Sequence, residues 1–326
     1  MPTAKSQKLK AKNNCFFIVN LNNAAKLTNN YQLSIVNYQL FINFVAMKAR
    51  WILFGAVLML FAACSQKQQH TFTNELLLPM TPVKDQGKTE LCWAYAMLAT
   101  IETEHLLRGD SVNLSPVYIG RMLKMEKTTV STSRLRNGGN EKLVNGKSVN
   151  SKSQRAMGQT LLNMIQKFGI VPYDVLPDDA TDDLPTPKWV FMLGTRYTPW
   201  EFAHSVCAPD EYLSLTCFPD SPYYKKIVVP VPDNWEQNRL INLPLDTLRQ
   251  HVDSALHHRH PVCWESRGHA MCIVGMARDE GGRPYYIMKN SWGPQGPHKG
   301  LVYMSARRAW RDAIAIYMTR DAFHHP

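Results

Sequence analysis

Acidic residues are absent from the first 63 positions of this 326-residue chain, although seven Lys or Arg residues occur there. Without this segment the formal net charge falls from +11 to +4, because 30 basic residues then stand against 26 acidic ones. A balance so close to neutral is not typical of a nucleic-acid-binding protein, and no basic run is interleaved with aromatic residues. We therefore expect no nucleic acid partner.

The chain also lacks an apolar run of the roughly 20 residues that a membrane-spanning helix needs. Its N-terminal apolar stretch, "MKARWILFGAVLMLFAAC", is shorter and has two cations at its start. A charged start, a short apolar stretch and small residues before a cysteine are typical of a secretory signal, so we predict a signal peptide at 47–63. Residues 1–46 show no targeting pattern, and we interpret them as an extension ahead of a true start at Met47.

The end of this stretch, "LFAACS", resembles the lipobox of bacterial lipoproteins. The resemblance implies that Cys64 is the lipidated first residue of the exported protein and that 64–71 is a short linker. A lipid anchor on Cys64 would then hold the chain at a membrane of the bacterial cell envelope. Phe61 is larger than the residues usually found three positions before such a cysteine, so cleavage after Ala63 and an uncleaved anchor stay open as alternatives.

Cysteine pairs with the C-x-x-C spacing of a zinc site are missing as well. We therefore expect no metal and no other cofactor. In an exported protein Cys207 and Cys217 are candidates for a disulfide, but reduced, half-buried thiols explain these residues equally well. The sequence does not determine the redox state of Cys207, Cys217, Cys263 and Cys272.

Cys92 stands at the start of a predicted helix. The segment "CWAYAMLATIETEHLL" spaces its apolar residues as a buried helix does, and the preceding "MTPVKDQGK" has the Pro, Asp and Gly of a loop. A thiol at a helix N-terminus feels the positive end of the helix dipole, which favours the thiolate and therefore a nucleophile. A structural cysteine is the alternative, and the partners of Cys92 must decide between the two.

Three polar residues are candidates for the base, the orienting residue and the oxyanion donor that a catalytic thiol needs. His269 directly precedes the apolar run 271–276, which we predict to be a buried strand. Asn290 follows a second apolar run, 285–288. If these strands are antiparallel neighbours, His269 and Asn290 meet at one end of the pair, and Gln86 in the loop before the helix can point its amide at the same place.

These residues resemble the papain-like cysteine peptidases. The segment "PVKDQGKTELCWAYA" is similar to that family's nucleophile segment, "GHAMCIVG" to its histidine strand and "KNSWG" to its asparagine motif. Within the family, "VPVPDNW", "LPLDTLRQHVDSAL" and "KNSWGPQGPHKGLVYMS" resemble the branch of bleomycin hydrolase and bacterial aminopeptidase C. The resemblance covers about 72–320, and we assign 72–326 to one peptidase domain.

The resemblance implies an α+β, two-lobed papain-like fold. A helical lobe at about 72–170 would bear the nucleophile, and an antiparallel β-rich lobe at about 236–320 would bear the histidine and the asparagine. The implied activity is hydrolysis of peptide bonds, in an aminopeptidase-like manner, with peptides as substrates. Nothing in the sequence supports a homo-oligomer.

The resemblance also assigns roles to individual residues. Cys92 would be the nucleophile, His269 the base, Asn290 the residue that orients it, and Gln86 the oxyanion donor. Two tryptophans would support these residues, with the second shielding the bond between His269 and Asn290 from water. The supporting residues are Trp93 and Trp292.

The chain departs from the family at several positions. Thr89 occupies the place of the family's disulfide-forming cysteine. Arg155 and Ala156 occupy the place of the glycine pair that binds the substrate backbone, and Gly158 is the nearest glycine that could replace it. Two other glycines lie further upstream, Gly138 and Gly139. The bleomycin hydrolase branch blocks its cleft with the C-terminal tail, but the sequence does not show whether "RDAFHHP" reaches the cleft.

Two alternatives from other classes remain at this stage. A peptidoglycan-cleaving Cys-His hydrolase would suit an exported lipoprotein, although the motif "NSWG" argues against it. An inactive, peptide-binding relative would suit the missing glycine pair, although the four candidate catalytic residues are all present.

Overall fold

The computed structural model describes Met47 and residues 71–136, 143–144, 147–148 and 153–324. The chain divides into two units after Gln69, and the second unit, His70–Pro326, is compact. Most of the predicted extension, signal peptide and linker, including Cys64, lies outside the described residues, as do Gly138 and Gly139. Among the described residues, no helix has both the length and the apolar character needed to cross a membrane.

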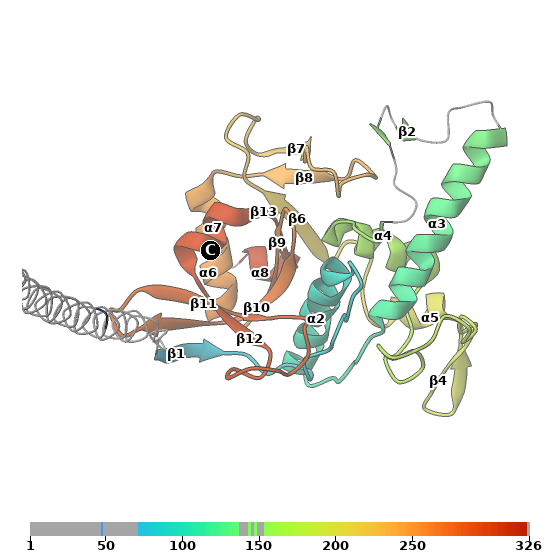
Figure 1. Cartoon of the computed structure of the whole chain (residues 1–326), viewed down its shortest axis with the longest axis horizontal. Coiled ribbons are helices and arrows are strands. Elements are labelled where there is room, and N and C mark those ends of the chain that lie inside the picture. The colour runs from blue at the N-terminus through green and yellow to red at the C-terminus, as the bar shows by residue number, and fades with distance from the viewer. Residues whose placement is uncertain (1–46, 48–70, 137–142, 145–146, 149–152, 325–326) are drawn as a thin grey trace, which may run out of the picture. The chain divides into compact units, whose positions relative to one another are not determined.

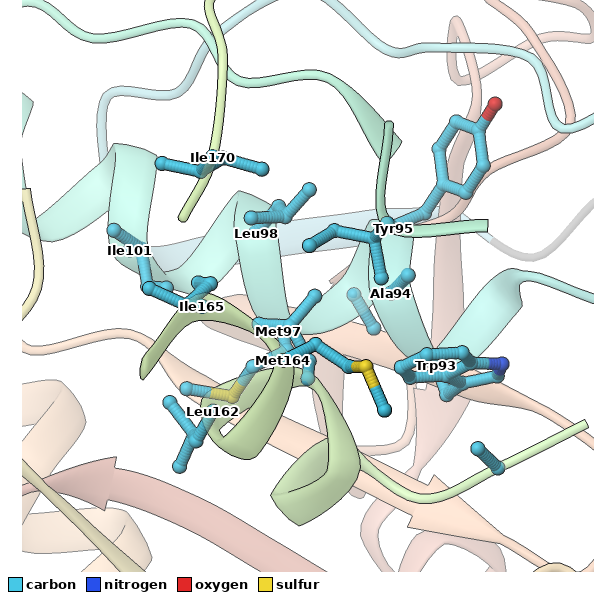
Figure 2. Close-up of a cluster of buried hydrophobic side chains, with 14 of the residues drawn as sticks. Trp93, Ala94, Tyr95, Met97, Leu98, Ile101, Leu162, Met164, Ile165 and Ile170 are labelled. Carbon is cyan, nitrogen blue, oxygen red and sulfur yellow. The ribbon is translucent and has the colours of Figure 1, made fainter. Parts of the chain in front are cut away.

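A bundle of helices forms one part of the second unit. Its longer helices are α2 (Cys92–Leu107), α3 (Pro116–Arg136) and α4 (Gly158–Phe168), and α5 (Pro199–His204) is short. Helix α2 is buried from Trp93 to His105, because its sequence carries apolar or small residues on every face. Figure 2 shows Trp93 and Met97 of α2 beside Met164 of α4 in the core of this part.

A large, mainly antiparallel sheet forms the other part. Its strand order is β12-β11-β10-β9-β13-β6-β8-β7, β1 pairs with β10, and only the β6–β8 pair is parallel. The strands are β1 (Phe72–Leu77), β6 (Tyr212–Thr216), β7 (Lys225–Val228), β8 (Arg239–Asn242), β9 (Val262–Ser266), β10 (Ala270–Asp279), β11 (Pro284–Lys289), β12 (Leu301–Ser305) and β13 (Ala313–Thr319). Helices α6 (Leu245–His257), α7 (Ala306–Asp312) and α8 (Arg320–His324) complete this part.

The central strands separate two hydrophobic cores. Along β9, Cys263 packs into the core of the helical part, whereas Val262 and Trp264 pack into a second core with α6 and α7. This alternation follows from the strand geometry, in which successive side chains point to opposite faces. Figure 1 shows α2 on one side of β9 and β13 and α6 and α7 on the other. Helix α2 therefore lies directly against the sheet.

The predicted α+β class, with a helical part and a β-rich part, is confirmed, but the boundaries of the two parts were wrong. Strand β1 was assigned to the helical part and instead pairs along β10. Its side chains are mostly exposed, so it lacks the apolar alternation that marks a strand in the sequence. Strands β6 and β7 also join the sheet, although they precede position 236. The β-rich part is therefore assembled from two separate stretches of the chain, 72–77 and 212–324.

Two small hairpins lie outside the large sheet. Strands β2 (Leu143–Val144) and β3 (Lys147–Ser148) form one, and β4 (Val190–Met192) and β5 (Thr195–Tyr197) form the other. The second hairpin stands beside α5, away from the strands of the large sheet (Figure 1).

Candidate active site

Cys92 is the first residue of α2, as predicted, and its thiol is half-buried. The backbone N–H groups of Ala270 and Trp93 lie near enough to this thiol to lower its pKa. Since Ala270 is the first residue of β10 and directly follows His269, the thiol lies beside the start of the histidine strand. The helix N-terminus and the sheet thus meet at Cys92.

His269 and Asn290 meet at one end of the β10–β11 hairpin. The antiparallel register pairs Cys272 with Lys289, which brings the residues before β10 and after β11 together. The distance between His269 Nε2 and Asn290 Oδ1 is 2.7 Å. The backbone N–H of Ser291 also donates to Asn290 Oδ1, at 2.8 Å, so this atom must be the amide oxygen. Nε2 of His269 therefore carries a proton, and Nδ1 is left to accept one.

The two predicted supporting tryptophans have different surroundings. Trp292 is 59% exposed, and its ring stacks on the imidazole of His269 with the centroids 4.9 Å apart. It covers one face of the imidazole, which forms the bond to Asn290. Trp93 is buried, and its indole N–H donates to the carbonyl of Gln154 at 2.9 Å. Trp93 thereby fixes the segment just before Arg155 to the start of α2.

Gln86 is held at both ends of its side-chain amide. Its Oε1 accepts a hydrogen bond from the hydroxyl of Ser291 at 2.6 Å, and its Nε2 donates to the carbonyl of Thr89 at 2.7 Å. Thr89, which stands where the resemblance implies a cysteine, thus closes the turn by hydrogen bonds, because its hydroxyl also donates to the Gln86 carbonyl. A bridge between Asp85 and Trp292 joins this loop to the segment after β11. The loop of Gln86 and the loop of Asn290 are therefore one connected structure.

A buried network of charges lies behind these loops. Glu102 on α2 is fully buried, bonds to the side chains of Lys84 and Thr81, and accepts the N–H of Leu114 at 2.8 Å. Lys289, at the end of β11, donates to the hydroxyl of Thr81 at 2.7 Å and lies 4.0 Å from the Glu102 carboxylate. This network ties the loop before α2, the helix itself and the strand that ends just before Asn290 to one another.

Burial opposes a separate charge on either candidate catalytic group. It raises the pKa of the Cys92 thiol, which the amides of Ala270 and Trp93 and the guanidinium of Arg155 partly offset. Burial likewise lowers the pKa of His269, and the bond to Asn290 acts in the opposite direction. Transfer of a proton from the thiol to the imidazole forms both charges together, so each stabilises the other.

Arg155 lies between the helical part and the histidine loop. Its guanidinium forms an ion pair with Asp233 at 3.1 Å and donates to the carbonyl of Arg267 at 2.9 Å. Its positive charge lowers the pKa of both Cys92 and His269. A charged side chain therefore stands where the resemblance implies the first cleft glycine.

Gly158, the first residue of α4, is buried between Glu265 of β9 and Tyr317 of β13. Its N–H donates to the buried carboxylate of Glu265 at 3.2 Å, and the hydroxyl of Tyr317 donates to the same oxygen at 2.7 Å. A Cβ at Gly158 would lie 2.6 Å from the ring of Tyr317, so the glycine permits close packing. This interior position argues against the predicted contact with substrate. Burial raises the pKa of Glu265 to about 7.

Comparison with known proteins agrees with this geometry. Residues 244–320 match the family model described as papain family cysteine protease. This segment is therefore similar to that family. Cathepsin L1 of Drosophila melanogaster is 25% identical over 238 residues, covering 72% of this chain and 53% of that protein. The chain thus spans about half the length of this curated relative.

Solved structures extend the likeness beyond the segment 244–320. PepW from Lactobacillus rhamnosis has a TM-score of 0.61 at 17% identity, covering 77% of this chain and 82% of that one. Digestive procathepsin L 3 of Tenebrio molitor larval midgut has a TM-score of 0.42 at 16% identity, covering 78% and 71%. The predicted papain-like two-lobed fold is confirmed.

The C-terminal tail packs away from the candidate catalytic residues. Phe323 of α8 stacks on His251 of α6 with the ring centroids 4.0 Å apart. Thr319, just before α8, contacts Glu104 near the end of α2. Twelve residues separate Glu104 from Cys92, so at 1.5 Å per helical residue the two positions lie about 18 Å apart along α2. Through His324 the tail therefore packs on α6 and on the C-terminal end of α2, and not at the Cys92 end of that helix.

The described cysteines are free thiols, so the disulfide considered for two of them is not formed in this structure. They are Cys92, Cys207, Cys217, Cys263 and Cys272. Within the ranges that the structure describes, no group of three His, Cys, Asp or Glu side chains is placed to hold a metal ion.

The sequence reasoning missed three residues around the site, each of which left a local signal. Ser291, which bonds to Gln86, belongs to the quoted motif "NSWG". Glu265 directly follows the apolar stretch "VCW", and Lys289 directly follows the apolar stretch "YYIM". A charged residue in an apolar strand is rarely buried without a partner, and this rule would have identified both.

Proposed function

We propose that this protein is a cysteine peptidase that hydrolyses peptide bonds through Cys92, His269, Asn290 and Gln86. One observation carries the proposal. The start of α2 brings the Cys92 thiol to the first residue of the strand that follows His269, and His269 bonds to Asn290 at 2.7 Å. A thiol, a base and an orienting amide in this order can transfer an acyl group.

The reaction would proceed through a thioester. His269 Nδ1 takes the proton of the Cys92 thiol, and the sulfur attacks the carbonyl carbon of the peptide bond. The N–H of Cys92 and the Nε2 amide of Gln86 stabilise the negative oxygen that forms. As the carbon–nitrogen bond breaks, His269 returns its proton to the leaving amine. Water then attacks the thioester, which releases the acid and restores the thiol.

Active-site labelling tests the proposal. We expect a peptidyl vinyl sulfone to modify Cys92 and not Cys217, which is the other half-buried thiol among the described residues and serves as an internal control. Mass spectrometry of tryptic peptides identifies the modified residue. The variant His269→Ala should lose the labelling, because the thiol then lacks its base. Equal labelling of the two cysteines, or labelling that survives His269→Ala, would contradict the catalytic pair.

We assign the activity to the bleomycin hydrolase and aminopeptidase C branch on the motifs quoted above, and propose aminopeptidase-like action on peptides. A cleft-blocking tail does not support this preference, because α8 packs on α6. Two fluorogenic peptides that differ only in acetylation of the N-terminal amine test it. Hydrolysis of the free peptide alone supports an aminopeptidase, and equal hydrolysis of both indicates an endopeptidase.

The place of action is proposed from the lipobox resemblance, which predicts export and a lipid anchor on Cys64. The variant Cys64→Ala tests the anchor in the full chain. We expect membrane-fraction recovery and a lipid-modified N-terminal peptide for the unaltered chain and loss of that peptide in the variant. An unmodified Cys64 in the mature protein would exclude the lipoprotein assignment.

A further inference from the structure

The β4–β5 hairpin exposes apolar side chains that no described residue covers. Its base is anchored, because Val190 is fully buried and its cross-strand partner Tyr197 packs against the core of the helical part. Beyond this pair, Phe191 is 74% exposed and Leu193 is 96% exposed. Three more large apolar side chains are exposed on or beside the hairpin, Trp189, Met192 and Trp200.

Leu193, at the tip, lowers the stability of the isolated protein in two ways. Leu193 and Gly194 form the turn with φ of 51° and 76°. Two positive φ values in a two-residue hairpin loop suit Asn-Gly or Gly-Gly, and a leucine adopts this conformation only with strain. The same leucine is almost fully exposed to water. A strained and exposed apolar side chain at a hairpin tip indicates a contact with something outside the chain.

The charges of the hairpin have one sign. Residues 184–200 contain Lys188 and Arg196 and no acidic residue. Arg196 lies across from Phe191 in the hairpin, and its guanidinium is 4.1 Å from the centroid of the Trp189 ring. Lys188, Trp189 and Arg196 therefore lie nearer the base of the hairpin than the apolar tip at Leu193 does.

The acids that flank the hairpin in sequence are bound elsewhere. Glu201 directly follows Trp200, and its carboxylate accepts the N–H of Thr198 at 2.7 Å in the capping box of α5. Asp182 and Asp183 line a cavity together with Arg121 and Lys124 of α3, so basic groups offset their charge there. The hairpin itself keeps its positive charge. An apolar tip followed by aromatic rings and cations is the arrangement that enters the interface of a lipid bilayer, where the long cationic side chains reach the head groups.

We propose that the β4–β5 hairpin inserts its tip into the surface of an anionic lipid bilayer. The size of the apolar surface favours lipid over a protein partner, because a stable protein interface takes about 20–30 residues on each side. A few apolar side chains are enough to enter a bilayer surface when cations assist them. This membrane contact depends neither on the anchor proposed for Cys64 nor on the peptidase activity.

Vesicle sedimentation tests the hairpin in the unit that begins at His70. This unit contains all three described hydrophobic cores and lacks the segment of the proposed anchor. We expect it to sediment with vesicles of phosphatidylcholine and phosphatidylglycerol, and more weakly with phosphatidylcholine alone. Equal sedimentation with both would overturn the choice of an anionic surface, and no sedimentation with either would overturn the membrane contact.

The variant Leu193→Asn separates membrane contact from folding. Removing one inserted leucine should weaken partitioning roughly 10- to 100-fold. The melting temperature should rise, because Asn tolerates positive φ better than Leu does. Tyr224→Asn is the matched control, since Tyr224 also has a positive φ, of 59°, and is 67% exposed. It should melt higher as well but keep full vesicle binding.

Two results with these variants would overturn the proposal. The first is vesicle binding of Leu193→Asn equal to that of the unaltered unit. The second is a dimer of the unaltered unit that Leu193→Asn dissociates while vesicle binding stays the same, because the tip would then belong to an interface between two copies of the chain.

Discussion

Replacement of Glu102 by Gln tests the buried charge network that joins the loops of the candidate site. Lys289 is only 4% exposed, and its ammonium lies 4.0 Å from the Glu102 carboxylate. At an effective dielectric constant of about 20, two unit charges at this separation attract each other by about 4 kcal/mol. Glutamine has nearly the same shape but no charge, so the variant loses this attraction without creating a cavity.

The contribution of Lys289 to this loss has an upper limit, because Lys289 can release its proton in the folded variant. Deprotonation at pH 7 of an amine with a pKa of about 10.4 costs about 4.6 kcal/mol. Both routes therefore predict that loss of the Lys289 attraction alone lowers the free energy of unfolding by about 4 kcal/mol, out of about 5–15 kcal/mol for a typical protein. The lost ion pair with Lys84 adds to this. Urea unfolding followed by tryptophan fluorescence measures this change.

The pH dependence of the variant identifies the cause. Burial already lowers the pKa of Lys289, and Glu102 acts in the opposite direction, so the variant lowers it further. Between the lower folded pKa and the normal unfolded pKa, the unfolded chain binds more protons. The stability of Glu102→Gln should therefore rise relative to that of the unaltered protein as the pH increases from about 7 to about 10.

Glu75→Gln provides the matched control. Glu75 forms an ion pair with Arg278 in which both side chains are at least 41% exposed, so its loss should change the free energy of unfolding by less than about 1 kcal/mol. If Glu102→Gln also loses less than about 1 kcal/mol at pH 7, or if its loss does not shrink at higher pH, the reasoning about Lys289 is wrong.

Three further predictions concern activity and assume the proposed peptidase function. Asn290→Ala should lower kcat/KM by about 10- to 150-fold, the effect of one lost hydrogen bond to a charged group, because the imidazole of His269 is no longer oriented. Arg155→Met should move both limbs of the pH profile of kcat/KM to higher pH. In the unaltered protein the guanidinium lowers the pKa of both Cys92 and His269, and the variant loses this effect. Gln86→Ala should lower kcat by about 100-fold or more while the melting curve shows a folded protein, because an oxyanion donor is lost.

Each activity prediction has a result that would contradict it. Full activity of Asn290→Ala would mean that another group orients the imidazole. A pH profile of Arg155→Met that stays in place, or moves to lower pH, would mean that this guanidinium does not act on the catalytic pair. Unchanged kcat in Gln86→Ala would assign the oxyanion role to backbone N–H groups alone.

Local patterns in the sequence were sufficient to bring the candidate catalytic residues together. Cys92 follows a loop and opens a helix, and His269 and Asn290 flank two apolar runs, so the meeting of these residues required only that the strands pair. The resemblance to the papain-like peptidases supplied the order of the two parts. The exposed strand β1 could not be predicted, because its pairing with β10 depends on a partner about 200 residues away.

The buried charges were also beyond the reach of sequence reasoning. Glu102 looks like an ordinary polar residue of a helix, and its burial follows from Lys84, Lys289 and the N–H of Leu114 converging on it. Arg155 was recognised as a departure from the family, but its pairing with Asp233 links positions 78 residues apart. Partners distant in sequence leave no periodic signal, so only the folded structure reveals them.

The turn at Thr89 is held by hydrogen bonds and does not depend on a disulfide, so a change in the redox potential of the surroundings does not break it. Where the resemblance expects a disulfide, this chain closes the loop of Gln86 with hydrogen bonds, and the described cysteines are all free. Dithiothreitol can therefore keep the Cys92 thiol reduced without breaking a cross-link in the described part of the chain. An oxidant, in turn, would switch off the proposed chemistry at Cys92 and leave the scaffold folded.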